Sequence, residues 1–129
     1  MNLESPKVTV QKSSNEIYNY LSEIKNFEFL MPDTIEDFQS DSEAFHFTLK
    51  GMPKIHLKLD EQEAPNKIIL GSTSEKFPFT LKIDIEDNSE SSSDVQLVFD
   101  GKFNPMVAMM IKSPIQKFIN TLSDNLQTK

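Results

Sequence analysis

Two adjoining stretches decide the fold: FTLKIDIEDNSESSSDVQLVFDGKF at residues 79–103 and NPMVAMMIKSPIQKFINTLSDNLQ at residues 104–127. In the first stretch, apolar and polar side chains alternate on both sides of a polar tip. This alternation predicts an antiparallel hairpin with one apolar face. In the second stretch, apolar residues recur every three or four positions, which predicts a long amphipathic helix able to cover such a face.

The register of the hairpin can be tested on its own residues. If Ile85 lies opposite Val95, every cross-strand pair on that face is apolar, as expected for a face packed on a core. The further pairs that this register predicts are Ile83 with Leu97 and Leu81 with Phe99.

The helix is expected to begin at Pro105, because Asn104 is a favourable N-cap and proline is favoured at the first helical position. Pro114 lies within the helical pattern and predicts either a kink or a new helix after Ser113. The apolar stripe of the helix consists of Val107, Ile111, Ile115, Phe118, Leu122 and Leu126.

Alternation also marks residues 45–59 and predicts a second hairpin. The expected pairs are Phe45 with Leu59, Phe47 with Leu57 and Leu49 with Ile55, all of them apolar. In this register His46 lies opposite Lys58 and His56 lies opposite Thr48, so both histidines face outward. Surface histidines beside lysines predict no metal site. A bulge that inverted the alternation would turn both rings inward, where one of them could donate a proton.

The rest of the chain adds two short helices and three strands. Residues 3–10 predict the first strand, and Ser13 with Glu16 forms a capping-box pattern that starts a helix. Residues 27–31 predict a second helical turn, which ends before a proline. Two further strands are expected at residues 35–39 and 67–73. The predicted sheet therefore has seven antiparallel strands.

Composition excludes several kinds of site and partner. The length of 129 residues suits one domain spanning residues 1–129. The absence of cysteine excludes disulfides, thiolate catalysis and cysteine-ligated metals. All 13 basic residues are lysines and the net charge is −7, which disfavours a nucleic-acid partner. We expect no cofactor and no metal, and the pattern leaves the oligomeric state open.

Targeting signals are not apparent in the sequence. The first residues lack the basic and apolar regions of a secretory signal. The longest apolar run, at residues 106–111, is far shorter than the roughly 20 residues that span a bilayer. We therefore expect a soluble, cytoplasmic protein without a membrane span.

The order of these elements is similar to the helix-grip fold of the START and birch-pollen-allergen superfamily (SRPBCC), which includes the polyketide cyclase/dehydrase-like proteins. Residues 7–21, KVTVQKSSNEIYNYL, resemble the first strand and helix start of that family. Residues 26–32, NFEFLMP, resemble its short second helix with a proline-terminated turn. The resemblance implies an α+β fold, in which a long C-terminal helix lies across the concave face of a curved seven-stranded sheet.

The resemblance also implies an apolar cavity between sheet and helix that binds a small apolar or amphipathic ligand, such as a lipid or a polyketide-like or aromatic metabolite. The candidate cavity residues are Tyr20, Phe45, Phe47, Leu57, Phe79, Leu81, Phe99, Phe103, Met106, Met110, Ile111 and Phe118. No nucleophile–base pair, phosphate loop or nucleotide fingerprint is present, so no catalytic residue is assigned.

Two other functions stay open. A cyclase- or aromatase-type enzyme would use Tyr20, or an inward-turned histidine, to move a proton in the same cavity. A protein-interaction module would have a filled core instead. Met106, Met109 and Met110 cluster where the last strand enters the helix, and they fit either a flexible cavity mouth or gap-filling core.

Overall fold

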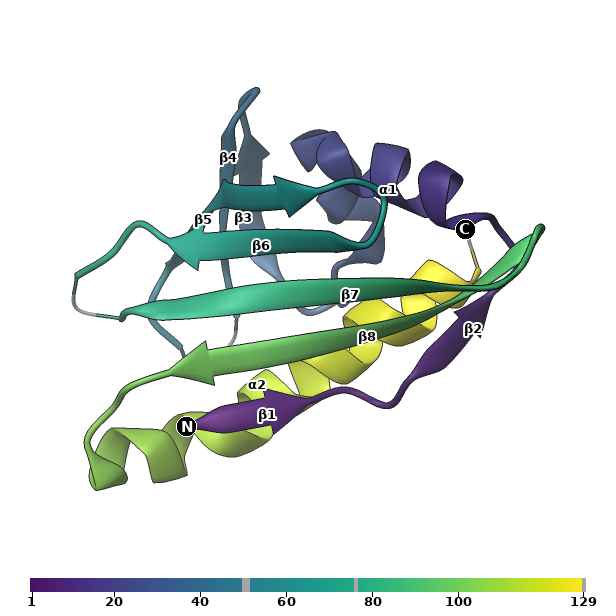
Figure 1. Cartoon of the computed structure of the whole chain (residues 1–129). Helices are drawn as coiled ribbons and strands as arrows, with labels where there is room; N and C mark the ends of the chain where they lie inside the picture. Colours follow the sequence, from purple (N-terminus) through teal and green to yellow (C-terminus); the bar gives the residue numbers. More distant parts are fainter. Residues whose placement is uncertain (50–51, 76, 129) are drawn as a thin grey trace.

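The structure is a computed structural model that describes residues 1–49, 52–75 and 77–128 (Figure 1). Within these ranges the chain order begins β1 (Asn2–Glu4), β2 (Val8–Val10), α1 (Ser14–Ser22), the 3-10 helix η1 (Ile24–Leu30), β3 (Glu36–Ser40) and β4 (Ala44–Thr48). It continues with β5 (Ile55–Glu63), β6 (Lys67–Ser72), β7 (Phe79–Ser89), β8 (Ser92–Gly101) and α2 (Pro105–Gln127). The predicted α+β class and element order are confirmed.

All strands belong to one antiparallel sheet with the order β1-β8-β7-β6-β5-β4-β3, and β2 also pairs with β8. The sheet is strongly curved, because β3 and β4 stand nearly upright in Figure 1 while β6, β7 and β8 run across it. Helix α2 lies on the concave side and packs against β1, β2, β8 and η1. Helix α1 packs against β6, β7 and η1. This is the predicted helix-grip arrangement.

The predicted first strand is divided into two, which raises the strand number from seven to eight. Ser5 lies at the division, where its Oγ accepts a hydrogen bond from the Leu97 N–H at 2.9 Å. The Ser5 N–H donates to the Leu97 carbonyl, also at 2.9 Å. Pro6 follows and has no N–H to continue the ladder. A side-chain hydrogen bond therefore replaces a backbone one where β1 gives way to β2.

The other edge of the sheet is irregular as well. The pairing between β3 and β4 shifts its register between Glu36 and Gln39. Asp37, inside this shift, has a φ of 56°, in the left-handed region that aspartate tolerates better than most residues. A bulge therefore interrupts edge strand β3.

The predicted register of the β7–β8 hairpin is confirmed. Ile85 pairs with Val95, and the next pairs on the same face follow as expected. Both faces of β6 are partly apolar, so its sequence does not show which face is buried. Pairing with β7 decides this, because Ile68 lies opposite Ile83 and is buried. Strands β6, β7 and β8 thereby share one buried face.

The predicted register of the β4–β5 hairpin is wrong by two residues. Phe45 pairs with Leu57, and Phe47 pairs with Ile55. Leu49 lies beyond the end of β4, where its carbonyl accepts a hydrogen bond from the Met52 N–H at 2.9 Å. A slip of two residues leaves every side chain on its original face. Apolar pairing therefore could not distinguish the two registers.

Both predicted helix starts are confirmed. The Ser13 side chain accepts a hydrogen bond from the Glu16 N–H, and the Asn104 side chain accepts one from the Val107 N–H at 2.9 Å. Helix α2 continues through Pro114 as one helix. Among the described residues, no helix combines the length and the apolar character needed to cross a membrane.

Candidate ligand-binding groove

A groove of about 610 Å³ lies between the middle of α2 and the connection from η1 to β3. It is lined by Pro32, Asp33, Thr34, Leu49, Ser113, Pro114, Lys117, Phe118 and Thr121. Its walls therefore come from three parts of the chain: α2, the η1–β3 connection and Leu49, which follows β4.

Two side-chain hydrogen bonds hold α2 to the elements around it. The Gln116 side-chain amide donates to the Glu4 carbonyl on β1 at 2.9 Å. The Asn125 side-chain amide donates to the Leu30 carbonyl, the last residue of η1, also at 2.9 Å. These two contacts fix the helix to β1 and to the end of η1.

The wall of the groove opposite α2 is the η1–β3 connection, which starts where η1 ends at Leu30. Met31 has an extended backbone, and a residue that precedes proline disfavours helical geometry. The Ile35 N–H donates to the Pro32 carbonyl at 3.3 Å and closes a tight turn. Asp33 and Thr34, within that turn, are exposed and line the groove.

The groove combines an apolar floor with a polar rim. Leu49 and Phe118 are buried beneath it, and Pro114 is half-buried. Lys117 and Asp33 are exposed and bring charges of opposite sign to the rim. Such a surface can bind the apolar part of a ligand on its floor while the polar end of the ligand stays at the rim near water.

The centre of the concave face is filled by aromatic rings. A series of stacked rings runs from Phe27 through Phe45 and Phe47 to Phe118 on α2. The ring centroids are 5.1 Å apart for Phe27–Phe45, 5.9 Å for Phe45–Phe47 and 5.2 Å for Phe47–Phe118. The stacked rings join η1 to β4 and β4 to α2, and Phe118 ends the series at the floor of the groove.

Comparison with solved structures relates this geometry to known proteins. Norcoclaurine synthase from Thalictrum flavum, as a point mutant with a transition-state analogue, has a TM-score of 0.75 at 10% identity, covering 99% of this chain and 92% of that one. Protein XoxI from Bacillus cereus has a TM-score of 0.68 at 10% identity, covering 98% and 93%. The Aha1 dimer from Colwellia psychrerythraea gives 0.64 at 12% identity, covering 98% and 96%.

The chain has the helix-grip fold, which it shares with these structures. No family model matches its sequence, and no curated protein sequence matches it. The same fold is therefore formed here by a sequence with only about a tenth of its positions identical to those of these structural neighbours.

Most residues predicted to line a cavity of the helix-grip fold lie in its interior. Those that are buried are Phe45, Phe47, Leu57, Phe79, Leu81, Phe99, Ile111 and Phe118. Phe103 is partly buried, and its ring lies 6.2 Å from that of Phe99. Of the whole predicted set, Phe118 is the residue that also lines the groove.

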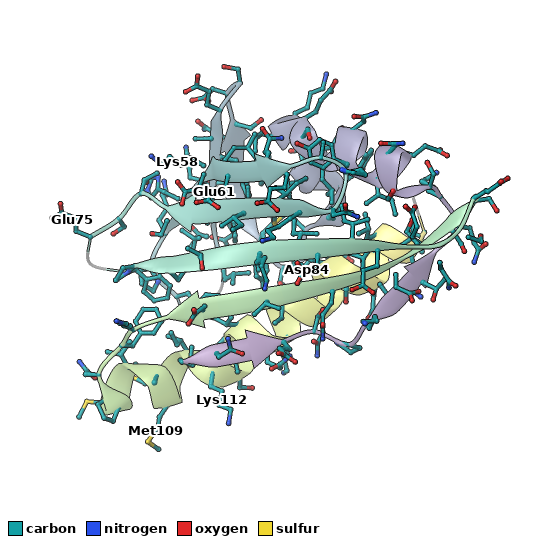
Figure 2. All side chains as sticks on the ribbon, in the orientation of Figure 1. Lys58, Glu61, Glu75, Asp84, Met109 and Lys112 are labelled. Carbon is teal, nitrogen blue, oxygen red and sulfur yellow. The ribbon has the colours of Figure 1, made fainter. Side chains whose placement is uncertain are left out.

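The predicted methionine cluster lies on the surface. Met106, Met109 and Met110 are 74%, 82% and 71% exposed, which excludes the gap-filling core role. Figure 2 shows Met109 and Lys112 pointing outward near the start of α2. Met109 borders a shallow pocket that includes Ser113 and Lys117, two residues of the groove. Met109 therefore flanks one approach to the groove.

Tyr20, the predicted orienting hydroxyl, lies on α1 and is half-buried against the core. Partial burial raises the pKa of its phenol, because the ionised form loses hydration. Tyr20 does not line the groove. The polar residues that border it include Asp33, Thr34 and Lys117, which the sequence did not indicate. Two signals pointed to the region: Pro32, which ends η1, and Pro114, which interrupts the hydrogen bonding of α2.

Proposed function

We propose that residues 1–129 form a single domain that binds a small apolar or amphipathic molecule in the groove beside α2. One observation carries this proposal: the groove has an apolar floor, formed by Leu49 and Phe118, and a charged rim. Its volume of about 610 Å³ falls in the range of about 300–1,000 Å³ that is usual for small-molecule sites.

The rim suggests how a ligand would be oriented. Lys117 can receive an anionic or hydrogen-bond-accepting group, and Thr121 and Ser113 offer hydroxyls. The apolar part would contribute about 25 cal/mol for each Å² removed from water. Norcoclaurine synthase, solved with dopamine and hydroxybenzaldehyde, shares the fold at 10% identity and gives a precedent for small aromatic ligands.

A fluorescent probe tests the proposal directly. 8-Anilinonaphthalene-1-sulfonate has an apolar body and an anionic end, so it is expected to bind the groove and to brighten. Ser113→Trp places an indole in the groove and should weaken binding by about tenfold or more. Asp124→Trp is the matched control, because Asp124 is exposed on the same helix outside the lining.

The outcome separates groove binding from general surface binding. If Ser113→Trp and Asp124→Trp bind the probe equally, the groove is not the site. If Ser113→Trp alone loses binding while its urea midpoint is unchanged, a groove site is supported.

A second candidate function, a protein-interaction module, is favoured by the exposed methionines. Met106, Met109 and Met110 form an adaptable apolar surface of the kind used by proteins that accept varied partners. Native mass spectrometry of protein from its own host separates the two functions. A bound molecule of small, fixed mass supports the groove, whereas a bound polypeptide lost on changing the three methionines to glutamine supports the second candidate.

A further inference from the structure

The corrected register brings the two histidines of the chain together. His46 on β4 pairs directly with His56 on β5, and their ring centroids lie 5.2 Å apart with 36° between the ring planes. Their neighbours Phe45 and Phe47 are buried, and Phe47 contacts α2 through Phe118. Because side chains alternate along a strand, the two imidazoles lie on the face opposite α2.

The backbone pairing favours close approach of these side chains. The Leu59 N–H donates to the Glu43 carbonyl at 3.2 Å, and the Thr73 N–H donates to the His56 carbonyl at 3.2 Å. The polar backbone groups of His56 are therefore directed toward β6, and His46 and His56 form a non-hydrogen-bonded pair. Side chains of such pairs lie closer together than those of hydrogen-bonded pairs.

The separation suits two imidazoles that share one metal ion. A metal about 2.1 Å from one nitrogen of each ring lies about 3.2 Å from each ring centre. With a tetrahedral angle at the metal, the two ring centres are then about 5 Å apart. The observed 5.2 Å agrees with this value.

The surroundings of the pair leave room and bonding capacity for a ligand. Both histidines line a pocket of about 320 Å³, together with Gln39, Ser40, Asp41 and Thr73. Within the described part of the chain, Nδ1 of His46 is buried and has no hydrogen-bond partner. A buried polar atom without a partner is rare in proteins, and a bound ion is one of the arrangements that satisfies such an atom. The Asp41 carboxylate adds a negative charge to the pocket, which favours a cation, whereas Lys58, the lysine that the sequence placed beside the histidines, is exposed and does not line the pocket.

We propose that His46 and His56 form a two-imidazole binding site for a divalent first-row transition metal ion. In residues 1–49, 52–75 and 77–128, no third histidine, cysteine, aspartate or glutamate completes a ligand group with them. The site therefore leaves coordination positions for water or for an oxygen ligand held in the pocket. Of the described residues, none lines both this site and the groove beside α2. A metal bound there would join the neighbouring strands β4 and β5.

The chain makes a clean test possible, because it has two histidines and no cysteine. Tag-free protein in a non-coordinating buffer is titrated with Zn²⁺ and Cu²⁺ by calorimetry, with Mg²⁺ as the hard-cation control. We expect one ion per chain, tighter binding of Cu²⁺ than of Zn²⁺, and no binding of Mg²⁺. Metal at about 100 times its Kd should raise the Tm by roughly 5–10 °C.

Variants identify the ligands. His46→Asn and His56→Asn should each weaken Zn²⁺ binding by about tenfold or more, and the double variant should abolish it. Thr73→Val is the matched control, because Thr73 lines the same pocket but has no imidazole to bind the metal. The urea midpoints of all variants are measured in EDTA, which removes the metal and tests folding alone.

Two results would overturn the proposal. One is Zn²⁺ binding of equal affinity in the wild type and the double histidine variant, which would assign the ion to surface carboxylates. The other is the absence of Zn²⁺ and Cu²⁺ binding by folded wild-type protein, which would leave a stacked imidazole pair without a metal. In the supporting case, the ring signals of both histidines shift together in NMR spectra as Zn²⁺ is added.

Discussion

The ring of Phe118 on α2 stacks on the ring of Phe47 on β4, with 5.2 Å between the centroids and 28° between the planes. This contact connects α2 to β4, which lies next to the edge of the sheet opposite β1. Removing the Phe118 ring should therefore loosen the helix over β4 and deepen the groove beside it.

Phe118→Ala is expected to lower the free energy of unfolding by about 3–5 kcal/mol, because a buried ring is replaced by a cavity. Urea denaturation measures the change. Phe29→Ala is the matched control, since Phe29 is 58% exposed, and it should change stability by less than about 0.5 kcal/mol. Equal effects of the two substitutions would contradict the packing described for Phe118.

Ser5→Ala tests the hydrogen bond at the division between β1 and β2. The substitution leaves the Leu97 N–H buried without its acceptor, so it should cost about 1–3 kcal/mol. Hydrogen exchange at the Leu97 amide should become faster. Ser91→Ala, at the exposed tip between β7 and β8, should leave both measurements unchanged.

Pro114→Ala should separate stability from ligand binding. Alanine restores an N–H inside α2, and proline is about 3 kcal/mol less favourable than alanine in a helix interior. Loss of the ring's contacts offsets part of this, so we expect a net gain of about 1–2 kcal/mol in the free energy of unfolding. Because Pro114 lines the groove, the affinity for anilinonaphthalene sulfonate should change. A less stable variant would show that α2 needs the proline.

Gly101→Ala is expected to destabilise the end of β8. A Cβ at this position would lie 2.6 Å from Cε2 of Phe103 and 3.0 Å from Cβ of Phe79. Overpacking of this kind costs about 1–3 kcal/mol. Gly71→Ala is the comparison, because its Cβ would meet the exposed Asp60 side chain at 3.2 Å, which can move away. Urea midpoints should rank Gly101→Ala as the less stable variant.

Asp41 predicts a local dependence of stability on pH. Hydrogen bonds from the Glu43 and Ala44 N–H groups hold the pKa of the Asp41 carboxyl below its usual value. A folded-state pKa below the unfolded value contributes stability at neutral pH, which is lost as the pH falls through the folded pKa. The stability difference between the wild type and Asp41→Ala should therefore shrink on acidification. A difference that grew at low pH would contradict this assignment.

The sequence was most informative where the pattern is long. The alternation from Phe79 to Phe99 predicted the pairing of Ile85 with Val95, and the residues around Asn104 predicted the start of α2. It was least informative for the β4–β5 hairpin, where both possible registers bury the same side chains. The pairing of His46 with His56 was hidden by that ambiguity.

The groove could not be predicted because its position depends on contacts between distant segments. Its lining combines residues 32–34 with residues 113–121, and the Asn125–Leu30 hydrogen bond helps to set their separation. Neither segment carries a pattern that reveals the other. What the sequence did provide is the proline in each segment, which marks where regular backbone hydrogen bonding fails.

The interruptions at the two edges of the sheet have a consequence for colloidal behaviour. One edge changes strand at Ser5 and Pro6, and the other bulges at Asp37, so neither presents a long, flat row of unpaired amides and carbonyls. Such rows recruit strands from neighbouring molecules and seed fibrils. We therefore expect the chain to resist edge-to-edge aggregation.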